Sequence, residues 1–144
     1  MLLLDANLLI YAFREEFPQH HSARDWLTAR LGSQSVGVPT LAETAFLRLS
    51  TKVLGKLKPA SWSQAWAFIS TLLDHPLAYR ISPGPQHPNI LDRLARSHGL
   101  RGDDLTDGWL AATAIELDAT LVSADLGFGR FKELRWQNPF KPCA

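Results

Sequence analysis

The sequence predicts an α/β fold of three layers, α/β/α, built on a central and mainly parallel sheet. Short apolar runs at 2–4, 36–38 and 120–123 are typical of strands that helices cover on both faces. Segments with apolar residues at helical spacing separate these runs, as expected for a parallel sheet. A chain of 144 residues can bury its own core. We therefore expect one domain over residues 1–137, followed by a proline-containing tail, 138–144, that frays.

Strands and helices alternate along the first half of the chain. The apolar spacing predicts a helix that ends at Gly32, a residue type favoured just after helices. Two further helices are predicted from the capping-box patterns that begin at Thr40 and Ser61. In chain order, we expect a strand at 2–4, a helix at 20–31, a strand at 36–38, a helix from 40 to about Leu54, before Gly55, and a helix from 61 to about 73.

The second half continues the alternation. Residues 82–88 are rich in proline, which predicts a loop. Asp104-Leu105-Thr106-Asp107 precedes an alanine-rich run and indicates the start of a long helix, with Asp104 as its N-cap. In chain order, we expect a strand at 77–81, a helix at 90–98, a helix from 104 to about 117, a strand at 120–123 and a final strand at 131–136.

Composition excludes several classes of protein. Cys143 is the only cysteine, so neither a disulfide framework nor a cysteine zinc site can form, and a reducing cytoplasm is the expected compartment. No apolar run approaches the length that spans a membrane, and Met1 is not followed by a signal-peptide pattern. The formal net charge of +1 argues against a protein that coats nucleic acid.

Four carboxylates are placed where predicted strands end or predicted helices begin: Asp5, Glu43, Asp107 and Asp125. Because ligands bind at the carboxyl edge of open α/β sheets, we expect all four to meet there around one divalent cation. Hard oxygen ligands favour Mg²⁺ or Mn²⁺ over zinc, and such sites hydrolyse phosphate esters. With these acids gathered in one pocket, the remaining surface is basic, which suits a phosphodiester substrate.

Structural roles for the same acids are the alternative. Glu43 can be the capping-box partner of Thr40, and Asp107 can be the corresponding partner of an Asp104 cap. Asp5 and Asp125 are not placed as obvious caps, and aspartate is depleted in strands. Two other functional classes fit less well. A phosphatase with an Asp nucleophile normally has Asp-x-Asp where this chain has Asp5-Ala6-Asn7, and a receiver domain would begin with an acidic pair.

Four segments resemble the motifs of PIN-domain ribonucleases, especially the VapC toxins of bacterial toxin-antitoxin pairs. The resemblance covers the chain from Leu3 to Phe131, and the order and spacing of the four segments match. They are Leu3-Leu4-Asp5-Ala6-Asn7-Leu8-Leu9, Pro39-Thr40-Leu41-Ala42-Glu43, the segment from Leu105 to Ala114 that contains Asp107, and Leu121-Val122-Ser123-Ala124-Asp125-Leu126-Gly127-Phe128.

The resemblance implies a PIN fold and a Mg²⁺-dependent endoribonuclease, with Mn²⁺ as a substitute ion. It implies that Asp5, Glu43, Asp107 and Asp125 are the catalytic and metal-binding acids. Ser123 and Asn7 would steady the site, and Asp104 is a less favoured ligand that would act through water. The implied nucleophile is a water activated by the metal, which leaves 5′-phosphate and 3′-hydroxyl ends.

The resemblance also implies partners. They are an RNA substrate, with transfer RNA as the family tendency, a VapB-like antitoxin and a second copy of the chain in a homodimer; no membrane is expected. Candidate phosphate contacts are Arg14, Arg101, Arg130 and Lys132. An RNA-processing PIN nuclease that is not a toxin, and a non-catalytic RNA-binding PIN module, remain the alternative functions.

Two pairs of side chains attract attention for other reasons. His20 and His21 are expected to be solvated at a helix start rather than to act as an acid-base pair. Trp62 and Trp66 lie one helical turn apart and are expected in the core or at a dimer interface rather than as a platform for bases.

Overall fold

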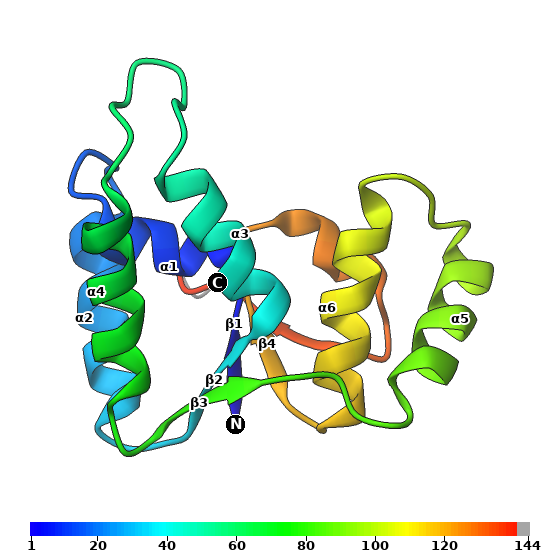
Figure 1. Ribbon diagram of the computed structural model, residues 1–144. Coiled ribbons are helices and arrows are strands. Elements are labelled where there is room, and N and C mark those ends of the chain that lie inside the picture. Colours follow the sequence, from blue (N-terminus) through cyan, green and yellow to red (C-terminus); the bar gives the residue numbers. More distant parts are fainter. Residues whose placement is uncertain (141–144) are drawn as a thin grey trace.

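The computed structural model describes residues 1–140 and confirms the predicted three-layer α/β/α fold (Figure 1). Its middle layer is a sheet of five strands in the order β3-β2-β1-β4-β5, and every neighbouring pair is parallel. The strands are β1 (Leu2–Leu4), β2 (Val36–Pro39), β3 (Ala78–Ile81), β4 (Thr120–Val122) and β5 (Arg135–Gln137).

Helices cover both faces of the sheet. One layer contains α1 (Ala6–Phe13), α2 (His20–Leu31), α3 (Thr40–Ser50) and α4 (Trp62–Leu73), and the other contains α5 (His87–His98) and α6 (Asp104–Glu116) (Figure 1). A short 3-10 helix, η1 (Leu126–Arg130), follows β4. Since all strands run the same way, their carboxyl ends form one edge, from which α1, α3 and η1 start.

Each face of the sheet has its own hydrophobic core, and β1 contributes to both. Leu2 and Leu4 pack among the residues of the α1–α4 layer, whereas Leu3 packs on the α5–α6 side. This division follows from the alternation of side chains along a strand. Burial of each such side chain contributes about 1.5–3 kcal/mol, and the two cores hold β1 rigidly at the centre. The acid that follows β1 is therefore attached to the best-fixed strand of the fold.

Several predicted boundaries are wrong, and two helices, α1 and η1, were not predicted. Helix α5 starts at His87 rather than at 90, inside the predicted loop 82–88. Helix α1 starts one residue after β1 and is only eight residues long, so the apolar run continues from strand into helix without a turn. Helix α3 ends at Ser50 rather than near Leu54, because the chain leaves the body of the protein and Leu54 forms a bridge with Leu57. The predicted strand at 131–136 is reduced to β5, because Phe131 packs on the α5–α6 side directly after η1. The predicted strand at 120–123 ends one residue earlier.

One predicted capping box is confirmed and one is wrong. The Ser61 hydroxyl accepts from the Gln64 N–H at 3.1 Å, and the Gln64 side chain accepts from the Ser61 N–H at 3.0 Å. At α3 the N-cap is Pro39, so Thr40 is already inside the helix and cannot cap it. The predicted Asp104 cap is also wrong, because the N-cap of α6 is the preceding aspartate, which makes no side-chain capping bond.

The C-terminal segment is packed as far as Phe140, whose ring meets Tyr11 edge-on at 5.5 Å between centroids. The rest of the predicted tail, including Cys143, lies outside the described residues. Among residues 1–140, no helix is both long and apolar enough to cross a bilayer.

Candidate active site

Asp5 stands at the point where β1 ends and α1 begins. Its N–H donates to the Val122 carbonyl at 3.0 Å, which extends the pairing of β1 with β4 by one bond. Its carboxylate accepts from the Ala6 N–H at 2.7 Å and caps α1. The expectation that Asp5 is not a cap is therefore wrong. The cap fixes the direction of the carboxylate at the carboxyl edge of the sheet.

A buried serine connects the ends of β1 and β4. The Ser123 hydroxyl donates to Asp5 Oδ2 at 2.7 Å and accepts from Asn7 Nδ2 at 3.0 Å and from the Asp125 N–H at 3.1 Å. These three bonds use the full capacity of a hydroxyl group. Asn7 adds a bond to Asp5 Oδ2 at 3.2 Å and accepts from the Ala124 N–H at 3.1 Å. Ser123 and Asn7 thus both hydrogen-bond to Asp5, and the positioning roles that the resemblance implies for them stay predictions.

Asp125 begins the turn after β4. Its side chain accepts from the Gly127 N–H at 2.8 Å and caps η1, so the expectation that Asp125 is not a cap is wrong as well. The residue is exposed at the carboxyl edge. Its free oxygen remains available to a ligand.

Asp107 lies in the first turn of α6 and is half-buried, in agreement with its predicted inward face. Arg130, at the end of η1, donates to Asp107 Oδ2 at 3.2 Å and lies 3.6 Å from Asp104. The guanidinium of Arg130 also packs over the Phe131 ring at 4.8 Å. Arg130, predicted as a phosphate contact, thus lies inside the acidic site, where its guanidinium forms ion pairs with Asp107 and Asp104.

The charges of Asp5, Asp107 and Asp125 act on one another. Burial raises the pKa of Asp5; the bonds from Ser123 and Ala6 lower it, and the negative charges of Asp107 and Asp125 raise it. Burial and the charge of Asp125 raise the pKa of Asp107, and Arg130 lowers it. Three carboxylates that repel one another favour binding of a cation. A cation offsets both this repulsion and the free-energy cost of burying ionised carboxylates.

Glu43 is paired with an arginine. Both oxygens of its buried carboxylate accept from Arg80, at 2.8 Å from Nε and 2.9 Å from Nη2. Arg80 lies on β3 and was not among the residues predicted for the site. A usable signal was a cation near the end of the strand that neighbours β2, since β2 leads directly into the helix of Glu43.

The expectation that four carboxylates surround one cation is not met by the side chains as they are oriented. Within residues 1–140, no three side chains of His, Cys, Asp or Glu are grouped to hold a metal ion. The reason is local: Arg80 binds Glu43, Arg130 binds Asp107, and backbone N–H groups hold one oxygen each of Asp5 and Asp125. The donor chemistry of Asp5, Asp107 and Asp125 still fits a hard divalent cation. Glu43 fits an arginine partner.

The remaining predicted contacts divide by exposure. Arg14 is buried and donates to the Lys58 carbonyl, so its position does not fit the predicted contact with RNA. Arg101 and Lys132 are exposed. His20 is buried against the Tyr11 carbonyl at 2.9 Å, which contradicts its expected solvation, whereas His21 is exposed.

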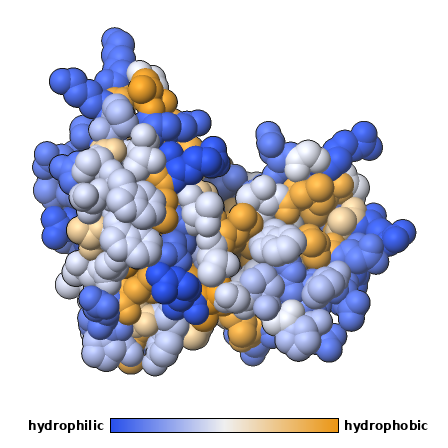
Figure 2. Space-filling view, in the orientation of Figure 1, coloured by the Kyte–Doolittle hydropathy of each residue, from blue (hydrophilic) through white to orange (hydrophobic). Residues whose placement is uncertain are grey.

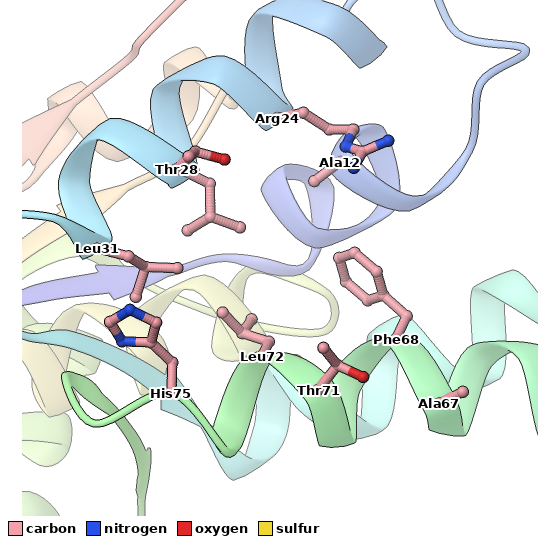
Figure 3. A pocket seen from close by; sticks show the side chains of 10 residues that line it. Ala12, Arg24, Thr28, Leu31, Ala67, Phe68, Thr71, Leu72 and His75 are labelled. Atoms are coloured by element: carbon pink, nitrogen blue, oxygen red, sulfur yellow. The ribbon is translucent and has the colours of Figure 1, made fainter.

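One cavity lies away from the acids. It has a volume of about 500 Å³ and lies between α2 and α4 (Figure 3). Leu31, Phe68 and Leu72 form its apolar wall, with Arg24 and His75 beside them. This arrangement suits an apolar segment of a partner rather than a phosphate ester.

Comparison with known proteins agrees with this architecture. The family model described as "PIN domain" matches residues 2–134. The chain is 38% identical over 141 residues to ribonuclease VapC43 of Mycobacterium tuberculosis, covering 96% of this chain and 95% of that protein. It is 34% identical over 140 residues to ribonuclease VapC31 of the same species, covering 96% and 99% of the two chains.

Two solved structures share the fold at low sequence identity. VapBC2 from Rickettsia felis, bound to a promoter DNA fragment, matches with a TM-score of 0.72 and 19% identity, covering 95% of this chain and 97% of that chain. FitAcB from Neisseria gonorrhoeae matches with a TM-score of 0.69 and 20% identity, covering 97% and 99%.

Proposed function

The chain belongs to the PIN-domain family, among the VapC ribonucleases, and from this membership we propose that it is a metal-dependent endoribonuclease toxin. The observation that carries the proposal is that the carboxylates of Asp5, Asp107 and Asp125 lie near enough at the carboxyl edge for their negative charges to act on one another. Asp5 would bind the cation most directly, since Ser123 and Asn7 fix its orientation. Mg²⁺ is the proposed ion, with Mn²⁺ as a substitute.

A divalent cation at such a site activates water and neutralises the charge that develops on a phosphodiester. The protein supplies position and charge. Asp107 and Asp125 complete the negative site, and Arg130 adds a positive group within reach of a phosphate oxygen once it leaves Asp107. Arg101 and Lys132 are exposed candidates for further phosphate contacts. We assign Glu43 to the pair with Arg80 and regard it as a ligand only if that pair opens.

The direct test compares wild type, Asp5→Asn and Asp92→Asn on single-stranded RNA in Mg²⁺ or EDTA. Asp92 is an exposed carboxylate on α5, in a pair with Arg96, and serves as the matched control. Wild type and Asp92→Asn should cut RNA in Mg²⁺ to 5′-phosphate ends, and neither should cut in EDTA. Equal cleavage by Asp5→Asn would refute the proposal.

An antitoxin is the proposed protein partner, in the cytoplasm. The cavity between α2 and α4 suits the apolar face of a helix, a common mode of peptide recognition (Figure 3). Thr71→Arg would fill this cavity from an exposed position. We expect it to abolish co-purification with a short protein encoded beside this gene and to leave RNA cleavage intact. Ser63→Arg, elsewhere on α4, is the control.

A homodimer is proposed from an apolar patch next to the acids. Leu105 and Trp109 are 43% and 38% exposed and, with Leu41, line shallow pockets between α3 and α6. Trp109→Ala should shift the protein toward monomer in light scattering, whereas Trp66→Ala, which removes another exposed indole, should not.

Growth arrest on expression, relieved by the co-expressed antitoxin, would separate a toxin from an RNA-processing nuclease.

A further inference from the structure

The segment between α3 and α4 is a shaped projection. Residues 51–60, here called the basic arm, extend from the end of α3 beyond the carboxyl edge of the sheet (Figure 1). The Ala60 N–H donates to the Ser50 carbonyl at 2.9 Å, and the buried Arg14 donates to the Lys58 carbonyl, so the base of the arm is closed. Leu54 and Leu57 form an antiparallel bridge at the turn. The arm is therefore held in place as an element of the fold.

The arm concentrates unpaired positive charge. It contains three of the five lysines of the sequence, Lys52, Lys56 and Lys58, and no acidic residue. All three are exposed, and within residues 1–140 none of them forms an ion pair. No acidic side chain on the arm offsets this charge. A polyanion is the ligand whose charge such a surface would attract.

Two exposed indoles adjoin the arm. Trp62 is the first residue of α4, two residues after the arm ends, and it stacks on Trp66 with ring centroids 5.4 Å apart and planes 14° apart. The two residues are 58% and 41% exposed, so they do not lie in the core, and their alternative expected place at a dimer interface stays a prediction. Exposed aromatic faces beside basic side chains are the combination with which proteins hold single-stranded nucleic acid.

The arm is within reach of a strand that enters the acidic site. Helix α3 starts at the carboxyl edge and carries Glu43 in its first turn, and the arm begins where α3 ends. The rise from Glu43 to Ser50 is about 10 Å at 1.5 Å per residue, a distance that a few nucleotides span. Figure 2 shows the surface hollowed at this edge, between the projecting arm and the side formed by α5 and α6.

We propose that the basic arm and the Trp62–Trp66 pair form a docking surface for single-stranded RNA next to the acidic site. The lysines would contact phosphates and an indole would stack on an unpaired base. This inference rests on the proposed ribonuclease function, because the acids supply the reason for RNA to enter the hollow. A membrane surface fits less well, because Val53 is the only strongly exposed large apolar side chain on the arm.

The charge part of the proposal is tested by binding in EDTA, which separates it from cleavage. A labelled single-stranded RNA would be titrated with wild type, with Lys52→Gln/Lys56→Gln/Lys58→Gln, and with a control triple. We expect the arm triple to bind about tenfold more weakly and its slope of log K against log salt to fall by about 2, since three phosphate contacts contribute roughly 0.7 each. The control triple, Arg93→Gln/Arg96→Gln/Arg135→Gln, removes three exposed charges elsewhere and should bind as wild type.

The indole part has a different signature. Trp62→Ala should weaken binding of single-stranded RNA by about fivefold or more with an unchanged salt slope, because stacking carries no net charge. Its affinity for fully paired RNA should not change, since paired bases are not free to stack on a side chain. A loss that is equal for single-stranded and paired RNA would contradict the stacking role.

The outcomes for the arm and for the nuclease are distinct. The proposal would be overturned if the arm triple bound single-stranded RNA within twofold of wild type and with the same salt slope. It would also be overturned if the arm triple lost binding to a protein partner but kept its binding to RNA. Absence of RNA cleavage by wild type in Mg²⁺ would refute the proposed function even if binding depended on the arm. Circular dichroism and the Tm of each variant confirm that the fold is intact.

Discussion

Arg80 on β3 holds the carboxylate of Glu43 on α3 with two hydrogen bonds, at 2.8 and 2.9 Å. The Glu43 side chain is 10% exposed and that of Arg80 is 49% exposed. If the pair breaks, water can still solvate the guanidinium of Arg80, whereas the buried carboxylate of Glu43 loses its partner and gains little water. The loss of the pair therefore costs Glu43 more than Arg80. The pair links an edge strand of the sheet to a helix that begins at the candidate active site.

We expect Arg80→Met to destabilise the fold more than the double substitution Arg80→Met/Glu43→Gln. The single change leaves a carboxylate buried without its partner, whereas the double change removes that charge. Because Arg80 is half-exposed, the coupling energy in a double-mutant cycle should be about 1 kcal/mol. Urea unfolding of the four proteins measures it. Additive effects of the two substitutions would show that the pair makes no net contribution.

The stability of the metal-free protein should depend on the pH through Asp5. The pKa of Asp5 is raised above its ordinary value of 3.8, chiefly by burial, so the folded state favours the protonated carboxyl. The free energy of unfolding then falls as the pH rises from below 3.8 through the raised pKa. Asp5→Asn, which cannot ionise, should be more stable than wild type at pH 7 in EDTA and no more stable at acid pH.

Chemical unfolding across this pH range tests the sign. Added Mg²⁺ or Mn²⁺ should raise the stability of wild type at pH 7 and leave that of Asp5→Asn nearly unchanged, since the ion binds the folded state through the acids. Lower stability of Asp5→Asn at every pH would show that the carboxylate is mainly a structural cap of α1.

Removal of the Ser123 hydroxyl should affect both stability and activity. Ser123→Ala leaves Asp5, Asn7 and the Asp125 N–H each without one partner in a buried place, at a cost of about 1–3 kcal/mol. RNA cleavage should fall by more than the loss of folded protein explains, because the direction of Asp5 is no longer fixed. Ser123→Thr, which keeps the hydroxyl, should restore cleavage, and failure of that rescue would contradict the positioning role.

Arg130 should compete with a divalent cation. Its guanidinium lies 3.2 Å from Asp107 and 3.6 Å from Asp104, and its removal takes a positive charge from the site. Near the surface such a charge is worth about 1 kcal/mol, so Arg130→Gln should bind Mn²⁺ about fivefold more tightly. Calorimetric titration measures this change, with Arg93→Gln as the remote control. Weaker binding would mean that Arg130 orients Asp107 for the ion.

Most of the layered fold was predictable because its central strands are short and apolar. Leu2–Leu4 and Leu121–Val122 are buried apolar runs, which is the pattern of strands covered on both sides. Helix α1 escaped prediction because it is short, largely apolar and follows β1 with only Asp5 between them, so no turn separates it from the strand. The acids at Asp5 and Asp125 were found, but their capping bonds were not, because α1 and η1 had not been expected.

The sequence by itself determined the order of the strands, most of the helices between them and the family to which the chain belongs, since these depend on local patterns of apolar residues and on the spacing of a few acids. Only the tertiary structure decided which charges neighbour one another. It joined Glu43 to Arg80 and Asp107 to Arg130, and it set Asp5 beside Ser123. Such pairs link residues far apart in the chain, and their energies depend on distance and burial, which exist only once the chain has folded.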